Sequence, residues 1–121
     1  MSKWPGMEMT DAGEVVVVLT TVPDEATAEK VARGLVESQL AACVNLVPGV
    51  RSIYRWQGAV SDDRELLCVV KTRRDAVGAL AAKLRELHPY QVPELLVIDL
   101  EQGAKAYLDW VLASVPLAFR K

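Results

Sequence analysis

Two cysteines and one histidine are the side chains of this chain best suited to bind a thiophilic metal ion or to act as nucleophile or acid–base group. Cys43 follows a predicted helix and starts a predicted strand, a position that suits a core residue, a metal ligand or a reactive thiol. Cys68 lies inside the apolar run LLCVV, which is typical of a buried structural thiol. His88 ends a predicted helix next to Pro89, where the negative end of the helix dipole favours an imidazolium as a simple C-cap.

His88 also opens the segment HPYQVPE, residues 88–94, in which two prolines stiffen the backbone. Tyr90 and Glu94 lie in the same segment, so one rigid loop offers an imidazole, a phenol and a carboxylate. A rigid loop that carries such side chains is a plausible wall of a ligand site. The segment therefore predicts either a ligand site or a stiff connection that His88 caps.

A polar and aromatic cluster interrupts the long apolar run over residues 40–72. Tyr54 and Trp56 are two positions apart, so their side chains point to the same face of a strand. We expect either an aromatic patch buried between subunits or one wall of a ligand cleft. Lys71 lies inside an apolar strand, where its ammonium either reaches the rim of the sheet or pairs with an acid such as Glu94 in a cleft.

Several common catalytic and binding motifs are missing from the sequence. It contains no GxGxxG, P-loop, HExxH or GxSxG pattern, and a Ser-His-Asp triad would depend on the single histidine. The net charge of −2 and the lack of a long basic block argue against nucleic-acid binding. No segment approaches the roughly 20 apolar residues of a membrane span. We therefore expect a protein that is not an enzyme and contacts neither nucleic acid nor membrane.

The spacing of apolar residues predicts the element order β-α-β-β-α-β-α. The predicted strands span residues 14–20, 42–60, 64–72 and 95–100; the predicted helices span residues 24–40, 75–88 and 104–114, with Asp24 and Asp75 as N-caps of the first two. Pro48-Gly49 predicts a bend or bulge in the second strand, and the polar residues 61–63 predict the turn before the third. This order is that of the ferredoxin-like split βαβ fold, an α+β architecture, here with a long hairpin.

One face of the predicted sheet has no helix to cover it. Right-handed crossovers place both long helices on the same face. The first and fourth strands are nevertheless apolar on both faces, as the run VVVV at residues 15–18 shows. Since soluble monomers rarely expose a large apolar patch, we expect the subunits to pack sheet against sheet as an oligomer.

The length of 121 residues suits one domain. We expect residues 1–13 to be a loose N-terminal segment and residues 14–121 to form a single domain. Residues 1–13 have neither the apolar stretch nor the cleavage site of a secretory signal, and the two cysteines are too far apart in the predicted hairpin for a disulfide. These features predict a reducing, cytoplasmic location.

Five stretches taken together resemble the CutA family of divalent-cation tolerance proteins. They are PDEATAEKVARGLVESQLAACVN, the P-x-x-x-S-x-Y-x-W-x-G spacing at residues 48–58, Glu65 with Lys71-Thr72, HPYQVPE, and YLDW at residues 107–110. The resemblance covers roughly residues 14–115. It implies a ferredoxin-like subunit in a tight, sheet-packed homotrimer that resembles PII signalling proteins, with long hairpins that reach to neighbours and clefts between subunits.

The same resemblance implies an association with tolerance of copper and other divalent metals. Cys43 and His88 match the family's AAC and HPY-x-x-PE motifs and are the candidate metal ligands. The candidate ligand-binding residues of the cleft are Tyr54, Trp56, Lys71, Tyr90 and Glu94. Some bacterial members carry further cysteines at the positions of Thr20 and Lys83, which argues here against a multi-thiolate site inside one subunit.

We therefore expect a trimer that binds copper, another divalent cation or a small ligand in intersubunit clefts and takes part in the response to metal ions. One thiolate and one imidazole per chain make a weak copper site unless trimer symmetry brings copies together. A second hypothesis is a trimeric scaffold that docks a protein partner and has no physiological metal site. A third is an enzyme that uses Cys43 as nucleophile or His88 as acid–base group, although no residue is identified that would orient either.

Overall fold

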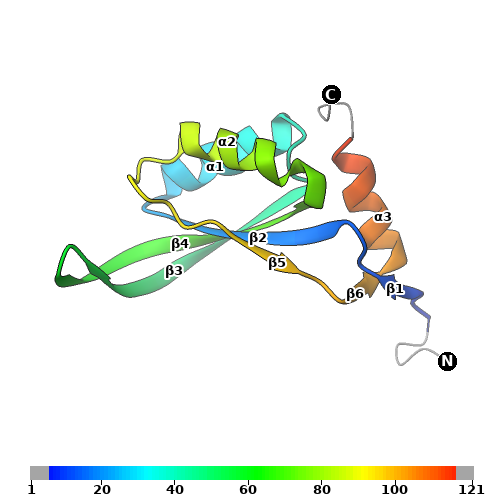
Figure 1. Cartoon of the computed structure of the whole chain (residues 1–121), viewed down its shortest axis with the longest axis horizontal. Coiled ribbons are helices and arrows are strands. Elements are labelled where there is room, and N and C mark those ends of the chain that lie inside the picture. The colour runs from blue at the N-terminus through cyan, green and yellow to red at the C-terminus, as the bar shows by residue number, and fades with distance from the viewer. Residues whose placement is uncertain (1–5, 117–121) are drawn as a thin grey trace.

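The computed structural model describes residues 6–116, and its centre is one antiparallel sheet (Figure 1). Four strands pair in the order β3-β4-β2-β5. Their bounds are Val15–Val22 for β2, Cys43–Trp56 for β3, Ala59–Arg73 for β4 and Leu96–Asp99 for β5. This strand order, with a helix after β2 and another after β4, confirms the predicted ferredoxin-like α+β fold.

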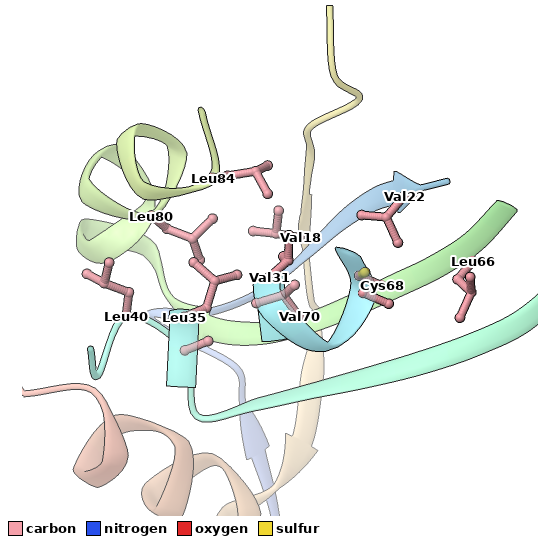
Figure 2. Close-up of a cluster of buried hydrophobic side chains, with 12 residues drawn as sticks. Val18, Val22, Val31, Leu35, Leu40, Leu66, Cys68, Val70, Leu80 and Leu84 are labelled. Atoms are coloured by element: carbon pink, nitrogen blue, oxygen red, sulfur yellow. The ribbon is translucent and has the colours of Figure 1, made fainter. Parts of the chain in front are cut away.

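Two helices cover one face of this sheet and enclose the main core. α1 spans Glu25–Glu37, and α2 spans Val77–Leu87 after a 3-10 turn at Arg74–Ala76. Both lie on the same side of the sheet in Figure 1, as right-handed crossovers require. Their apolar stripes pack on alternate residues of β2 and β4. Figure 2 shows this cluster, which includes Val18, Val31, Leu35, Cys68, Val70, Leu80 and Leu84.

The two helices begin in different ways. The Oδ1 of Asp24 accepts a hydrogen bond from the Thr27 amide at 2.8 Å, which confirms the predicted cap of α1. The predicted cap of α2 is wrong, because α2 follows the 3-10 turn and has no side-chain cap. Asp75 instead places its Oδ1 3.1 Å from Nε of Arg73 in a largely buried ion pair, which ties the turn to the end of β4.

β3 and β4 extend beyond the helices as a long hairpin, on the left in Figure 1. Its two-residue turn is Gln57-Gly58, where both residues have positive φ (50° and 80°), as a type I′ turn requires. The predicted turn at residues 61–63 is therefore wrong. Asp62 lies inside β4 and pairs across the hairpin with Arg51, with 2.7 Å between Oδ2 and Nη2. The polar residues that suggested a turn are cross-strand partners instead.

A two-stranded sheet and a third helix lie at the other end of the molecule (Figure 1). β1, Met9–Asp11, pairs with β6, Gln102–Ala104, and α3 follows at Lys105–Ser114. Leu108 and Val111 of α3 pack against Ala12 and Val15. The prediction that residues 1–13 are loose is therefore wrong for residues 9–12, because β-pairing and this small core hold them; residues 1–5 lie outside the described part.

The face of the central sheet opposite α1 and α2 is open over much of its area. α3 packs on this face only at the end near Val15. Farther along, Val47, Leu96 and Ile98 are 41%, 54% and 41% exposed. In residues 6–116 no helix has both the length and the apolar character needed to cross a membrane.

Candidate functional site

A pocket of about 580 Å³ lies where the hairpin leaves the body of the sheet, beside the loop that follows α2. Its walls come from β2, β3, β4 and that loop. The lining residues are Thr21, Ser52, Tyr54, Trp56, Glu65, Pro89, Tyr90, Gln91, Val92 and Glu94. The structure therefore brings four of the candidate ligand-binding residues, Tyr54, Trp56, Tyr90 and Glu94, into one pocket.

A bulge in β3 decides which side chains face this pocket. The register with β4 shifts between Val47 and Val50, which confirms the predicted bend. Odd-numbered residues of β3 face the open side of the sheet before the bulge, and even-numbered residues do so after it. Tyr54 and Trp56 therefore share a face with Glu65 of β4.

The positive charges of the hairpin lie on its opposite face. Arg51 and Arg55 alternate with the pocket-lining residues of β3, and Arg64 lies across from Arg51 on β4. The Arg51 guanidinium makes a paired contact with Asp62, with Nε–Oδ1 at 2.9 Å and Nη2–Oδ2 at 2.7 Å. Consequently none of the described residues that line the pocket is Lys, Arg or His.

Carboxylates set the charge of the pocket. Glu65 is only 8% exposed, and its Oε2 accepts a hydrogen bond from the Tyr90 hydroxyl at 2.6 Å. Oδ2 of the neighbouring Asp63 accepts a hydrogen bond from the Tyr54 hydroxyl at 2.5 Å. Glu94 lines the pocket from the loop. The walls are therefore anionic and aromatic.

Both pocket phenols are stabilised in their neutral form. Burial, followed by the hydrogen bond to Glu65, raises the pKa of Tyr90 well above the usual tyrosine value. The hydrogen bond to Asp63 raises the pKa of Tyr54. Both hydroxyls thus remain hydrogen-bond donors at neutral pH, directed at the side chains of Asp63 and Glu65.

His88 positions the loop and does not line the pocket. Its side chain is 5% exposed, and its Nε2 lies 2.7 Å from the carbonyl oxygen of Thr21. Its Nδ1 accepts a hydrogen bond from the Tyr90 amide at 3.2 Å, so the ring carries its proton on Nε2. The Arg85 guanidinium also donates to the carbonyl oxygens of His88, Tyr90 and Gln91. A metal ion at His88 would have to replace one of the two ring bonds.

Cys43 and Lys71 form a second group, the thiol cluster, at the other end of the open face. They are cross-strand partners, and Lys71 Nζ lies 3.7 Å from Cys43 Sγ. Asn45 Oδ1 lies 3.9 Å from the same sulfur. Burial, and to a smaller degree the contact with Cys43, raises the pKa of Tyr107 on α3, which joins this cluster. The thiol cluster thus carries one positive charge.

The structure separates Lys71 from the pocket. Lys71 is six positions beyond Glu65 along β4, which corresponds to roughly 20 Å at about 3.3 Å per residue. Of the two alternatives for Lys71, the pairing with Glu94 is therefore absent within the described chain, and the ammonium lies beside the Cys43 thiol.

The two candidate metal ligands are also apart. Cys43 lies at the level of Val17 in the sheet, whereas His88 contacts Thr21, four residues or about 13 Å farther along β2. Cys68 is buried in the core, where burial raises the pKa of its thiol to about 11. Across residues 6–116, no three His, Cys, Asp or Glu side chains are grouped so that they could hold a metal ion.

Two acidic residues beside the pocket were missed as site residues from the sequence. Glu65 was noted only as part of a family motif, and Asp63 was assigned to a turn. Their two-residue spacing matches that of Tyr54 and Trp56, but it becomes informative only when the hairpin turn is placed at Gln57-Gly58. This spacing was visible in the sequence, but the turn predicted at residues 61–63 prevented its interpretation.

Comparisons with known proteins match this architecture. The family described as CutA1 divalent ion tolerance protein matches residues 16–114, which include the whole pocket. The divalent-cation tolerance protein CutA of Thermus thermophilus is 53% identical over 95 residues, covering 78% of this chain and 92% of that protein. A solved structure of the Thermus thermophilus divalent cation tolerance protein gives a TM-score of 0.82 at 49% identity, covering 84% and 99% of the two chains. The structure of CutA from Synechococcus elongatus gives 0.86 at 37% identity, covering 90% and 96%.

Proposed function

This chain belongs to the CutA1 family of divalent ion tolerance proteins, and from that premise we propose that it acts in the response to divalent cations by binding a ligand in the hairpin pocket, without catalysis. The observation that carries this proposal is the pocket itself. It has about 580 Å³ of space, rigid walls on three strands and a proline-stiffened loop, and a buried carboxylate, Glu65.

The lining groups suit binding better than catalysis. The hydroxyls of Tyr54 and Tyr90 are engaged with Asp63 and Glu65, and burial and hydrogen bonding stabilise both phenols in the neutral form. His88 has both ring nitrogens engaged with backbone groups. A general base or nucleophile would have to be freed from these contacts first.

We propose further that the chain acts as a homotrimer whose pockets lie in clefts between subunits, in the cytoplasm. The open face of the central sheet supports this assembly, because half-exposed Val47, Leu96 and Ile98 would be covered by a neighbour. Two free thiols and no disulfide suit a reducing compartment.

For a metal ion, we propose copper with Cys43 as its thiolate ligand. Soft thiolate ligands select copper or zinc over harder cations. The remaining ligands must come from other subunits, because the described residues of one chain bring only Lys71, Asn45 and Tyr107 near this sulfur, and the Lys71 charge opposes a cation there. Among the described residues that line the pocket, no Lys, Arg or His opposes a cation at the carboxylates.

The test is calorimetric titration of the reduced, full-length protein with Cu(II) and Zn(II), with mass by light scattering and thiols counted before and after. Saturable binding by a trimer supports the proposal. Loss of binding in Cys43→Ser assigns the metal to the thiol cluster, and loss in Glu94→Gln assigns it to the pocket. Glu86→Gln, which removes an exposed charge on α2, is the matched control. A stable assembly that binds neither metal, and no other small molecule in the pocket, would contradict the proposal.

A trimeric scaffold that docks a protein partner is the second candidate. The exposed side chains of Ile53 and Val60 on the arginine-bearing face of the hairpin favour it, since they are 63% and 66% exposed and point away from the pocket, which lies on the other face. A partner that is captured equally by Glu94→Gln and by the natural chain, but not by an Ile53→Ser, Val60→Ser double variant, would support this reading.

A further inference from the structure

We infer that the ligand of the hairpin pocket is an organic cation, a small molecule that carries an ammonium or guanidinium group. This inference rests on the proposed function, because it names the chemical class of ligand for the same site. It follows from the charge, the aromatic content and the size of the pocket.

Within the described residues of one chain, the lining of the pocket is acidic and includes no Lys, Arg or His. Glu65 and Glu94 line the pocket, and Asp63 accepts a hydrogen bond from the hydroxyl of Tyr54, which also lines it. The arginines of the hairpin project from the other face because side chains alternate along a strand. A buried carboxylate without a cationic partner is costly, and a positively charged ligand removes that cost. Among the described residues of this chain, Glu65 is such a carboxylate, because it is 8% exposed and its hydrogen-bond donor is the phenol of Tyr90.

Aromatic rings provide the second feature that a cation would use. The rings of Tyr54 and Trp56 lie on the same face of β3 and are 43% and 42% exposed, so they are available to a ligand. Tyr90 faces them from the loop, with its hydroxyl fixed by Glu65. Cations bind over such ring faces, and tryptophan is the most favourable of the three aromatic residues.

The same features disfavour a bare metal ion at this position. A transition metal needs several donor atoms at close range, and the described chain groups no three His, Cys, Asp or Glu side chains in that way. A volume of about 580 Å³ is also far more than a single ion occupies. An organic cation would use the carboxylates at one end and the rings along its length.

The experiment is a titration of the full-length protein with three four-carbon probes of matched length. They are the dication putrescine, the neutral 1,4-butanediol and the dianion succinate. We expect putrescine to bind, with an affinity that falls as salt increases, and the other two to bind at least roughly tenfold more weakly. A putrescine affinity equal to that of butanediol, or below that of succinate, would overturn the inference.

Variants then locate the site. Glu94→Gln should weaken putrescine binding by about tenfold or more, and Trp56→Leu by roughly threefold to thirtyfold. Glu65→Gln is a second carboxylate test, read beside a thermal melt because Glu65 is buried. Glu86→Gln should leave binding unchanged, which controls for net charge. Putrescine binding that Glu94→Gln and Trp56→Leu leave intact would overturn the assignment to this pocket.

The failure of this inference can be told apart from that of the proposed function. If Zn(II) binds and Glu94→Gln abolishes that binding while putrescine does not bind, the pocket is a ligand site and the organic-cation inference is wrong. If neither putrescine, succinate nor metal binds, both the inference and the proposed ligand-binding function are wrong.

Discussion

The open face of the sheet carries two polar groups at opposite ends, and they differ in charge, shape and support. The hairpin pocket is concave and anionic, with carboxylates that accept hydrogen bonds from two phenols. The thiol cluster has one ammonium 3.7 Å from the Cys43 sulfur and includes Tyr107 of α3. Both groups lie on the same face of β4, roughly 20 Å apart by strand geometry.

The difference shows how one strand can serve two environments. The bulge in β3 brings aromatic residues opposite the acidic end of β4, and the regular register brings Cys43 opposite Lys71. The pocket is also held by a loop whose backbone is bonded to His88 and Arg85, whereas α3 contributes only a helix face to the thiol cluster. We therefore expect changes in the loop to affect the pocket strongly and the thiol cluster little.

The largest effect is expected from His88→Ala. The change removes the hydrogen bond to the Thr21 carbonyl and the hydrogen bond from the Tyr90 amide. Both are made by a side chain that is only 5% exposed. Losing two bonds and leaving a small cavity should cost about 3 kcal/mol in the free energy of unfolding. Denaturant unfolding at one fixed protein concentration measures this loss.

The same variant tests the contrast between the two groups. The rate of Cys43 alkylation in the native protein should stay unchanged, while ligand affinity in the pocket falls. His88→Gln, which retains a donor near the Thr21 carbonyl, should lose less stability than His88→Ala. A loss below about 1 kcal/mol for His88→Ala would show that the loop is held by other contacts.

The next effect is expected from Tyr90→Phe. Removal of the hydroxyl leaves the largely buried Glu65 carboxylate without its 2.6 Å donor, which should cost about 1–2 kcal/mol. Unfolding by denaturant at pH 7 measures it. Tyr107→Phe on α3, which leaves the pocket intact, is the matched control. Equal losses of stability in the two variants would show that the Tyr90–Glu65 hydrogen bond contributes no more than an ordinary tyrosine hydroxyl.

The stability of the natural chain and of Tyr90→Phe should also depend differently on alkaline pH. Folding raises the pKa of Tyr90, so this phenol contributes stability below its unfolded pKa of about 10, and the contribution disappears as pH rises through the folded value. The natural chain should therefore lose stability above pH 10, and Tyr90→Phe should lose less over the same range. Absorbance at 295 nm should show phenolate forming at higher pH in the folded than in the unfolded protein, because all three tyrosines have raised pKa values.

The layered fold was predictable because local patterns determine it. Continuous runs of valine and leucine predicted the strands, and apolar residues spaced three and four apart predicted the helices. Asp24 was predicted as an N-cap, and the structure contains this cap. The ferredoxin-like order followed from these elements alone. β1 was missed because its three residues have little pattern of their own, and pairing with β6 and packing under α3 determine their structure.

The candidate site was only partly predictable, because register depends on turn geometry. Tyr54, Trp56, Tyr90 and Glu94 were named from their types and spacing, and they do share a pocket. Lys71 was predicted to line the same cleft, because its cross-strand partner, Cys43, cannot be identified until the strand register is known. The polar run at residues 61–63 looked like a turn, although Gln57-Gly58 has the left-handed conformations that a two-residue turn needs.

That turn gives a smaller predicted effect. Gly58 has φ of 80° and nothing near the position of an added Cβ, so Gly58→Ala should cost about 1 kcal/mol through backbone strain alone. Thermal or denaturant unfolding measures it, and putrescine affinity should fall slightly because Trp56 directly precedes the turn. Gly78→Ala is the control, since this position is helical and also open, so alanine should be neutral or stabilising. Equal stability in the two variants would mean that the turn relaxes at no cost.

The smallest effect is expected from Lys71→Met, and it tests most directly whether the two groups are independent. Methionine keeps most of the length and the unbranched apolar stem of the lysine while it removes the charge beside Cys43, so stability should change by less than about 0.5 kcal/mol. Within one chain Lys71 is roughly 20 Å from Glu65 along β4, about two and a half Debye lengths at physiological salt, so putrescine affinity should change by less than about twofold. Calorimetric titration in 0.15 M salt measures this directly. A large gain in putrescine affinity would mean that Lys71 of one subunit reaches the pocket of another and repels the cation there. The two groups would then be halves of one intersubunit site, and the contrast between them would hold only for the isolated chain.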